Sequence, residues 1–403
     1  MTARALTPVD LSDATLYTED RWREPFAALR RDAPVSWRED SPYGSYWSVV
    51  THDLVQAVEL DWQTYSSQIG NITIADGVAG SEFPNFIAMD PPRHTEQRRV
   101  VAAAFTPSQM QLRERQVRAR TKELFDALPI GETFDWVAEV SIPTTIAMLA
   151  IVLDFPWDER MSLRKWSDLA SNVSPEVMTE EYTQAFFAEM GLMLARFDAL
   201  LDARRVQEPA DDLLSRMIHS EAMGNLTALE KIANIALLIV GGNDTTRNSM
   251  SGLIEALHRF PEARAAIAAD PALISNASQE IVRWQSPVTH MRRTLTKDAV
   301  LGGQHLKAGE KIVLWYLSAN RDEAVFADAE RYDPARDNAR RHIGFGHGIH
   351  RCVGARLAEI QLDTVIEELL ERGLVVEPQA QPTRLASPFL HGITAYPVKL
   401  VRE

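Results

Sequence analysis

The sequence predicts a mainly α protein with small β-sheets, an α+β fold, and three observations support that prediction. Apolar residues recur at helical spacing over long stretches, above all from Thr227 to about Phe260. Short runs of β-branched and aromatic residues, such as Val35–Arg38 and Lys311–Tyr316, stand between these stretches. No repeat, low-complexity run or Gly/Ser/Pro-rich linker divides the 403 residues, so we expect a single domain over residues 1–403.

The composition allows a large core and excludes several classes of function. Hydrophobic residues make up 45% of the chain, and the formal net charge of −14 argues against binding to nucleic acid or to an anionic membrane surface. Cys352 is the only cysteine, which excludes internal disulfides and fits a reducing compartment. The N-terminus has no apolar signal core, and the longest apolar run, Ile146–Leu153, is too short to span a bilayer. We therefore expect a cytoplasmic protein without a membrane anchor.

The first third of the chain alternates between helix and strand. Residues Arg21–Arg31 have the pattern of an amphipathic helix, and another helix is expected from near His52. Between them, Val35–Arg38 and Tyr46–Val50 are rich in residues that favour strands, with turn-forming residues in the connection. We expect these two segments to pair.

A long irregular segment follows, from Ser66 to Ala88. Glycines and a proline interrupt any helical or strand period there. A loop of this length inside a compact domain is usually either functional or disordered. Large apolar residues make a mobile surface loop the weaker interpretation: Ile72, Ile74, Val78, Phe83 and Phe86.

Helices dominate the middle of the chain. The sequence Asp90-Pro91-Pro92 is suited to open one, because proline is tolerated in the first turn. His94 and Arg98 then fall on one face at i and i+4, which alone is an ordinary polar pair. Further helices are expected over residues 107–127, 139–153 and 160–205, the last broken around residues 171–175.

The longest expected helix begins at a capping box, Thr227-Ala-Leu-Glu230, and carries Gly241-Gly242-Asn243-Asp244-Thr245 in its middle. Glycine inside a helix costs about 1 kcal/mol relative to alanine. The two glycines either let another helix pack closely or let a flat ligand and dioxygen approach the backbone. An Asp-Thr pair beside such a gap can pass protons, with the hydroxyl as donor and the acid as relay. From these residues alone the two interpretations are equal.

The last third mixes a helix with strands. Glu280 and Arg283 share a face of a helix that ends at Ser286-Pro287. Residues Val288–Thr296 have β character, Lys311–Tyr316 is expected to be a strand, and Phe389–Tyr396 is expected to form a hairpin.

The stretch Phe345–Gly354 reads Phe-Gly-His-Gly-Ile-His-Arg-Cys-Val-Gly and precedes a helical pattern. Its glycines allow positive φ and close approach to a flat ligand, and a thiolate near a helix N-terminus suits haem iron. A lone cysteine is more often a small buried hydrophobe, and a nucleophilic cysteine would not explain the glycines. Structural zinc needs four ligands, and no second Cys or His pair accompanies His347, His350 and Cys352.

The string Phe-Gly-x-Gly-x-His-x-Cys-x-Gly resembles the haem-binding loop of the cytochrome P-450 family, and every fixed position is filled. The resemblance covers most of the chain and implies the cytochrome P-450 fold, haem b (iron protoporphyrin IX) as cofactor, and Cys352 as the ligand of its iron. It favours proton delivery as the role of Asp244 and Thr245. One departure is Gln361, because many relatives carry Glu there and form a local ion pair that is not expected here.

The same resemblance implies roles for other residues. His94 and Arg98 match Pro-Pro-x-His-x-x-x-Arg and are expected to hold a haem propionate. Arg293 and His350 are also expected at the propionates, with Arg292 as the weaker alternative to Arg293, and Phe345 belongs to the cofactor-binding loop. In the core, the family's Glu-x-x-Arg motif and its later arginine match Glu280, Arg283 and Arg336, for which we expect a structural role.

The family's pocket segments correspond here to the Ser66–Ala88 loop, the middle of the long helix, the start of the β segment at Val288 and the last hairpin. Residues 160–205 correspond to a mobile lid over the substrate channel. The expected substrate-pocket residues are Ile74, Val78, Phe83, Phe86, Leu237, Gly241, Val288, Met291, Phe389 and Leu390.

The resemblance implies a haem-thiolate monooxygenase that hydroxylates an unactivated C–H bond with O2. The length leaves no room for a fused reductase, so electrons are expected from a separate ferredoxin and its NAD(P)H-dependent reductase. A peroxide-driven haem enzyme would lack the Asp244–Thr245 pair. A haem-thiolate sensor or carrier without turnover would need neither that pair nor a lid.

The pocket segments are mostly apolar, and His290, if protonated, is their only expected positive charge, so we expect a small neutral apolar substrate. The strings from Gly241 to Ser249 and from Met291 to Thr294 are most similar to those of the soluble bacterial alkane terminal hydroxylases. Terminal hydroxylation of a medium-chain alkane or similar linear molecule is therefore expected. A terpene or another hydrophobic ring compound is the alternative.

Overall fold

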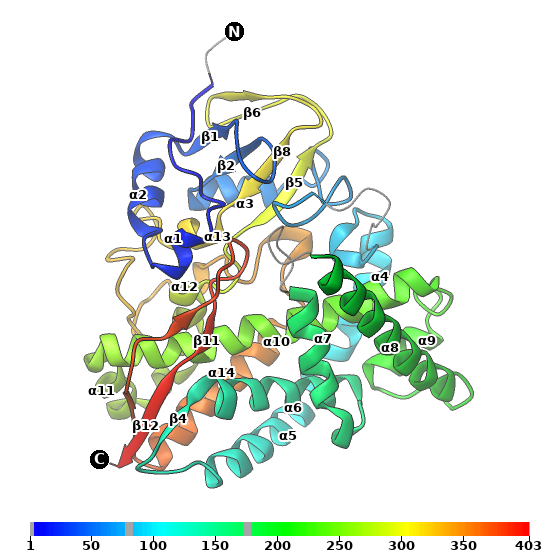
Figure 1. Cartoon of the computed structure of the whole chain (residues 1–403), viewed down its shortest axis with the longest axis vertical. Helices are drawn as coiled ribbons and strands as arrows, with labels where there is room; N and C mark the ends of the chain where they lie inside the picture. The colour runs from blue at the N-terminus through cyan, green and yellow to red at the C-terminus, as the bar shows by residue number, and fades with distance from the viewer. Residues whose placement is uncertain (1–3, 77–83, 172–178, 403) are drawn as a thin grey trace. The chain divides into compact units, whose positions relative to one another are not determined.

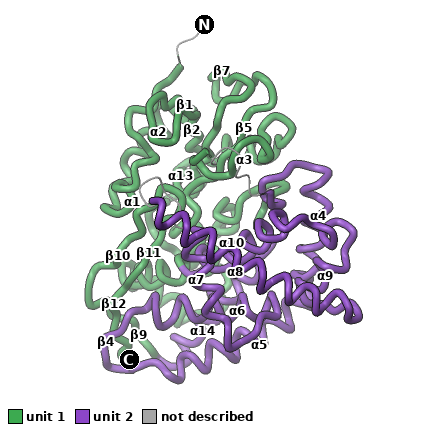
Figure 2. Tube along the Cα trace, turned by 45° about the vertical axis from the view of Figure 1, so that its right-hand side comes forward, with its two compact units in different colours: residues 1–82, 248–352, 374–403 green, residues 83–247, 353–373 purple. Residues whose placement is uncertain are grey.

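The computed structural model describes residues 4–76, 84–171 and 179–402, which form two compact units. Unit 1 comprises Met1–Glu82, Asn248–Cys352 and Leu374–Glu403, and unit 2 comprises Phe83–Arg247 and Val353–Gly373 (Figure 2). The expected fold class, mainly α with small sheets, is confirmed (Figure 1). The expectation of one domain over residues 1–403 stays a prediction.

A five-stranded sheet in the order β1-β2-β8-β5-β3 is the largest sheet of unit 1. The neighbours β2 and β8 are parallel, whereas the other neighbours are antiparallel. Val35 pairs with Val49 and Arg38 with Tyr46, which confirms the predicted pairing. The strands are β1 Val35–Arg38, β2 Tyr46–Val49, β3 Tyr65–Ser66, β5 Met291–Leu295 and β8 Lys311–Leu314.

Alternation along the strands divides the core of unit 1 into two clusters. Trp47 and Ile312 belong to one cluster, and their chain neighbours Tyr46 and Val313 belong to the other. Successive side chains of a strand point to opposite faces, so each cluster lies against one face of the sheet. Helix α3, His52–Leu60, contributes to the first cluster and helix α2, Arg23–Asp32, to the second.

Two expectations for the last third need correction. The strand expected over Lys311–Tyr316 ends at Leu314, and Tyr316 begins the short helix α13, Tyr316–Ala319. The final hairpin is formed by β10, Thr383–Arg384, and β11, Ile393–Ala395, so Phe389 and Leu390 lie in the connection between its strands. Unit 1 also contains two other antiparallel pairs: β6 Ala299–Leu301 with β7 Gln304–Leu306, and β9 Leu374–Pro378 with β12 Pro397–Arg402.

Helices complete unit 1 and make up most of unit 2. Unit 1 also contains α1 Thr15–Thr18, α11 Pro261–Ala269 and α12 Ile274–Gln285. The long helix α10, Ala228–Arg259, belongs to unit 2 as far as Arg247. Unit 2 further contains α4 Arg93–Ala102, α5 Pro107–Asp126, α6 Ile142–Leu153, α7 Met161–Ser171, α8 Glu180–Arg205, α9 Leu213–His219, α14 Ala355–Glu371 and the short strand β4 Thr133–Asp135.

Local sequence accounts for two helices of unit 2. Thr227 and Glu230 exchange the predicted capping-box hydrogen bonds, Thr227 N to Glu230 Oε2 at 2.9 Å and Glu230 N to Thr227 Oγ1 at 3.3 Å. Helix α6 is apolar on nearly all sides and is correspondingly buried along almost its whole length. None of the helices in the described part of the chain combines the length and apolar character needed to cross a membrane.

Candidate active site

The loop before α14 presents the only cysteine of the chain. Gly346 and Gly348 have φ of +69° and +63°, a region that residues with a Cβ rarely occupy. The loop closes on itself, because the backbone N–H of Cys352 donates to the carbonyl oxygen of Phe345 at 2.7 Å. The loop belongs to unit 1, and Cys352 is not covered by other side chains of the described residues.

Helix α3 and the segment after it support this loop. A Cβ on Gly348 would lie 2.4 Å from the carbonyl oxygen of Glu59, so only glycine fits at this contact. His350 Nε2 and Ser67 Oγ are hydrogen-bonded at 3.0 Å. The structure therefore brings the cysteine loop and His350 together with the end of α3 inside unit 1.

Arg293, the expected propionate ligand on β5, takes part in a buried network. Its guanidinium donates to Glu59 Oε2 at 2.9 Å and to the carbonyl oxygen of Arg292 at 2.8 Å. The hydroxyl of Tyr316 is hydrogen-bonded to the other carboxylate oxygen of Glu59. Glu59 was not predicted as a site residue. Its place on the apolar face of α3 with Val55 and Val58 would have predicted a buried carboxylate.

Arg292, the weaker alternative, contacts a different segment. It donates to Asp76 Oδ1 at 2.5 Å, and a Cβ on Gly70 would lie 2.5 Å from its Nη2. Neighbouring residues of a strand point to opposite faces, which separates Arg292 from Arg293. The other two expected propionate ligands, His94 and Arg98, lie on α4 in unit 2, where His94 is buried.

The two glycines of α10 have different surroundings. A Cβ on Gly242 would lie 2.7 Å from Leu149 Cδ2 of α6, so this glycine permits close packing of two helices. Among the described residues, no atom outside the adjoining turns of α10 lies within 4 Å of a Cβ placed on Gly241, which faces open space. Close helix packing therefore explains Gly242 and does not explain Gly241.

The Asp-Thr pair follows these glycines. Asp244 is fully buried and forms an ion pair with Arg247, Oδ1 to Nη2 at 2.6 Å. Burial raises the pKa of the Asp244 carboxyl above its usual range, and Arg247 acts in the opposite direction. The Thr245 hydroxyl donates to the Gly241 carbonyl oxygen at 3.1 Å. A carboxyl with a raised pKa can hold a proton closer to neutral pH, which suits a relay.

Five expected pocket residues of unit 1 lie around His290. The N–H of Ile74 donates to His290 Nε2 at 3.1 Å, and His290 Nδ1 lies 3.0 Å from the Pro388 carbonyl oxygen. The rings of His290 and Phe389 have centroids 5.4 Å apart. Val288 and Leu390 form an isolated antiparallel bridge, and Met291 begins β5 directly after His290.

The remaining expected pocket residues belong to unit 2 or lie outside the described residues. Phe86 is buried, and its N–H donates to Asn234 Oδ1 of α10 at 3.1 Å. Leu237 and Gly241 lie further along the same helix. Val78 and Phe83 are outside the part of the chain that the structure describes.

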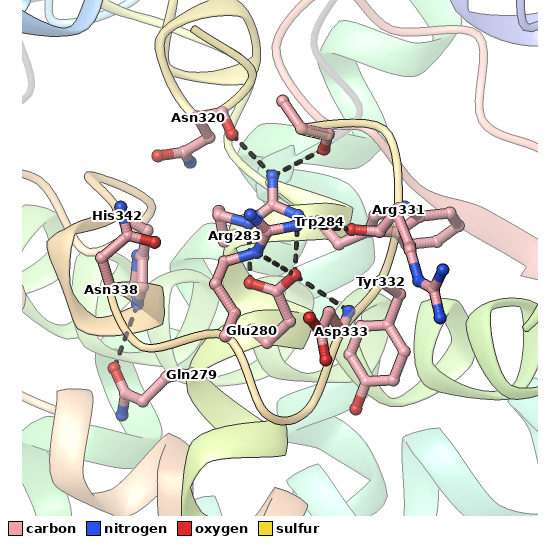
Figure 3. Close-up of polar contacts among 12 residues, drawn as sticks. Gln279, Glu280, Arg283, Trp284, Asn320, Arg331, Tyr332, Asp333, Asn338 and His342 are labelled. Atoms are coloured by element: carbon pink, nitrogen blue, oxygen red, sulfur yellow. Dashed lines mark hydrogen bonds and ion pairs between the residues drawn. The ribbon is translucent and has the colours of Figure 1, made fainter. Parts of the chain in front are cut away.

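A buried ionic network organises the core near α12. Glu280 accepts from Arg283 Nε at 2.7 Å and from Arg336 Nε at 2.8 Å, so the structure brings the three expected core residues together. Figure 3 shows the Glu280 carboxylate facing the Arg283 guanidinium. Arg283 also donates to the carbonyl oxygens of Asn320 and Ala329, each at 2.8 Å, so the pair fixes the backbone after α13.

The residues of unit 1 have the donor chemistry that haem requires. A thiol on a loop wound by two glycines could bind haem iron, and a guanidinium and an imidazole could hold carboxylates. Among the described residues, no group of three or more His, Cys, Asp or Glu side chains could hold a metal ion by itself. The thiol, the guanidinium and the imidazole together fit a haem with a single thiolate ligand.

Comparison with known proteins agrees with this site. The family description "Cytochrome P450" matches residues 272–400. The chain is 35% identical to the linalool 8-monooxygenase of Pseudomonas putida over 97% of its length and 98% of that protein. It is also 35% identical to a methyl-branched lipid omega-hydroxylase of Mycobacterium tuberculosis, over 97% of this chain and 95% of that one.

Two solved structures are similar along almost the whole chain. Cytochrome P450-153 from Novosphingobium aromaticivorans is 47% identical, with a TM-score of 0.92 and coverage of 97% of this chain and 99% of that chain. CYP153D17 from Sphingomonas sp. is 48% identical, with a TM-score of 0.93 and coverage of 98% and 99%.

Proposed function

Because the chain belongs to the cytochrome P450 family, whose members are haem b monooxygenases, we propose that it hydroxylates the terminal carbon of a medium-chain alkane or similar linear molecule. The observation that carries the haem-thiolate chemistry of this proposal is Cys352 on a loop wound by Gly346 and Gly348. When bound, haem supplies the activation of O2 and the oxidation of the C–H bond.

The protein's own residues have distinct roles in this proposal. The Cys352 thiolate, with Phe345 in the same loop, would bind the haem iron and donate electron density to it. Arg293, His350, His94 and Arg98 would hold the propionates through charge-assisted hydrogen bonds. The core residues Glu280, Arg283 and Arg336 keep the segments around them in place.

Asp244 and Thr245 are proposed to handle protons. Burial raises the pKa of Asp244, so its carboxyl can take up a proton from water more readily than an exposed aspartate. The Thr245 hydroxyl lies on the same turn of α10 as Gly241, beside the open space at that glycine. From this position the hydroxyl can hold a proton where dioxygen is reduced.

The pocket residues of unit 1 favour a neutral apolar substrate. Burial lowers the pKa of His290 to about 3, so this side chain carries no positive charge at neutral pH. Arg292 and Lys311 are engaged by the Asp76 carboxylate at 2.5 and 3.0 Å. Within the described part of unit 1, these pocket residues therefore offer no cation to a fatty-acid carboxylate, and burying that carboxylate unpaired would be costly.

Two relatives bear on the choice of substrate. The strings around Gly241 and Met291 support a linear substrate, and the similarity to a methyl-branched lipid omega-hydroxylase supports attack at the end of a chain. The similarity to a linalool 8-monooxygenase supports a second candidate, the hydroxylation of a terpene. Redox partners are proposed to be a separate ferredoxin and its NAD(P)H-dependent reductase, and O2 is the co-substrate.

An optical titration tests the substrate proposal. Alkanes, primary alcohols, monoterpenes and fatty acids of matched length would be compared for the shift from low-spin to high-spin haem at one salt concentration. We expect alkanes of medium length to bind most tightly. Tightest binding by the fatty acid would contradict the charge argument, and a clear preference for a monoterpene would move the proposal to the terpene class.

A further inference from the structure

A buried carboxylate that the proposed function does not use lies directly beneath the cysteine loop. The side chain of Glu59 is 1% exposed, and that of its partner Arg293 is 5% exposed. The backbone carbonyl oxygen of Glu59 would lie 2.4 Å from a Cβ placed on Gly348. A Cβ on Gly346 would lie 3.6 Å from the hydroxyl of Tyr316, which is hydrogen-bonded to Glu59. The loop therefore packs against the backbone of Glu59 at Gly348 and lies close to the Tyr316 hydroxyl at Gly346.

Stability alone is a poor reason for such a network. Taking a carboxylate and a guanidinium out of water is unfavourable for each ion, and an apolar pair of similar volume often stabilises a core as well. What the pair does provide is a fixed direction for Arg293. Two hydrogen bonds, to Glu59 Oε2 and to the Arg292 carbonyl oxygen, hold the planar guanidinium in one orientation. A guanidinium has five N–H donors, so Arg293 can keep both bonds and still donate to a haem propionate.

Glu59 also places a negative charge in this network. The charge lies beneath the cysteine loop in an environment that water does not screen. Reduction of haem adds an electron, and a nearby negative charge opposes that addition. The paired Arg293 guanidinium and the neighbouring Tyr316 hydroxyl both offset part of this charge, so the carboxylate balances the positive charge that Arg293 alone would place near the haem.

We propose that Glu59 is a positioning residue for the cofactor: it orients Arg293 toward a haem propionate and its charge lowers the reduction potential of the bound haem. The proposal rests on the proposed role of Arg293 and extends it to a carboxylate outside the motifs of the sequence. It assigns Tyr316 a moderating role, because the hydroxyl weakens the field of the carboxylate.

The test compares the reduction potentials of three holoproteins without substrate. Glu59→Gln should raise the potential, so that the ratio of reduced to oxidised protein at a fixed potential rises on the order of tenfold, as expected for removal of one poorly screened charge. Tyr316→Phe should shift the potential in the opposite direction, because the carboxylate loses a donor. Glu323→Gln removes a carboxylate that pairs with Arg30 at 2.6 Å and is 64% exposed, and it should leave the potential unchanged.

A second variant separates position from charge. Glu59→Asp keeps the charge but shortens the side chain by one methylene, so its potential should stay near that of the unmodified protein. Transfer of haem to apomyoglobin should be faster from this variant, because Arg293 is no longer held in place. A purely structural role would instead lower the melting temperature of the variants without moving the potential.

The outcomes are decisive in both directions. A Glu59→Gln potential equal to that of the unmodified protein, or a shift in the same direction from Tyr316→Phe, would overturn the proposal. If Glu59→Gln does not fold, unchanged haem transfer from Glu59→Asp would do the same. The spectrum of the reduced carbon monoxide complex is recorded for every variant. Absence of the thiolate spectrum in the unmodified protein would mean that the proposed function has failed, which is a different result.

Discussion

The backbone N–H of Ile74 donates to Nε2 of His290 at 3.1 Å, so this nitrogen carries no proton, and Nδ1 is left to donate to the Pro388 carbonyl oxygen. His342 is held in the same way, since the Gly344 N–H donates to its Nδ1 at 3.0 Å. His391 Nδ1 lies 2.6 Å from the Gln285 carbonyl oxygen, and its Nε2 is buried with no hydrogen-bond partner among the described residues. All three imidazoles therefore favour the neutral form.

Acid should consequently destabilise the fold below pH 6.5. Burial lowers the pKa of each of these three histidines to about 3, whereas an unfolded histidine has a pKa of about 6.5. The unfolded chain therefore binds more protons, and the free energy of unfolding falls as pH falls, by about 2 kcal/mol for each histidine at pH 5. Urea unfolding at several pH values measures this slope.

Two variants measure how much of the loss of stability in acid comes from a single buried histidine. His342→Asn keeps an acceptor for the Gly344 N–H but cannot titrate. The free energy of unfolding lost between pH 6.5 and pH 5 should therefore be smaller in this variant, by the contribution of one histidine. The exposed His305 is the control, and His305→Gln should leave the slope as it was. An unchanged slope in His342→Asn would contradict the assignment of a neutral buried imidazole.

The two glycines of α10 should respond differently to alanine. Gly242→Ala introduces a methyl group 2.7 Å from Leu149 Cδ2, and overpacking of this kind costs about 1–3 kcal/mol, less about 1 kcal/mol gained in helix propensity. Gly241→Ala meets open space and should stabilise the helix by up to about 1 kcal/mol. Thermal unfolding of both variants gives the comparison.

The spin state of the haem shows which of the two glycines faces the substrate pocket. Gly241→Ala is expected to weaken the substrate-induced shift to high-spin haem, because its methyl group enters the proposed pocket. In a Leu149→Ala background, Gly242→Ala should cost less stability than in the unmodified protein, because the shortened side chain leaves room for the added methyl group. Equal stability losses from both alanine variants would argue against the division of roles.

Thr245→Ala should uncouple reductant use from hydroxylation. Without its hydroxyl, proton delivery during oxygen reduction is less well controlled, so NAD(P)H is still consumed while hydrogen peroxide replaces product. Product formed per NAD(P)H oxidised is the measurement, with the buried neighbour Thr246→Ala as the control. Coupling as high in Thr245→Ala as in the unmodified protein would remove the proposed role.

Electron transfer should depend on salt and on the exposed arginines near the cysteine loop. Arg340, Arg341 and Arg351 are exposed in an otherwise acidic chain, and ferredoxins are typically acidic. Attraction between such surfaces is screened as ionic strength rises. Arg351→Glu should slow reduction by ferredoxin at low salt more than at high salt, by stopped-flow measurement. If the unmodified protein and Arg351→Glu are reduced at the same rate at both low and high salt, ferredoxin does not bind at the face that carries these arginines.

Patterns that depend on neighbours in the sequence were readable without a structure. The capping box at Thr227, the pairing of Val35–Arg38 with the strand that begins at Tyr46, and the positions of the long helices follow from local chemistry and periodicity. The strand expected to reach Tyr316 was wrong at its end, because a short apolar run fits a strand and a buried helix equally well.

Features that depend on distant partners were not readable. Glu59 and Arg293 are 234 residues apart in the sequence, and the residues around Glu59 do not indicate that Arg293 is its partner. The different surroundings of Gly241 and Gly242 depend on where Leu149 of another helix lies. The charge of His290 also depends on tertiary contacts, because only burial between Ile74 and Pro388 keeps it neutral.

The most direct test of the account is the spectrum of the reduced carbon monoxide complex of the purified protein and of Cys352→Ser. The unmodified protein should show the red-shifted Soret band of a thiolate-ligated haem, because Cys352 is the only cysteine in the chain. In Cys352→Ser that band should be lost, even where haem is retained. A Cys352→Ser variant that keeps the red-shifted band would contradict the assignment of Cys352 as the iron ligand, on which the proposed function depends.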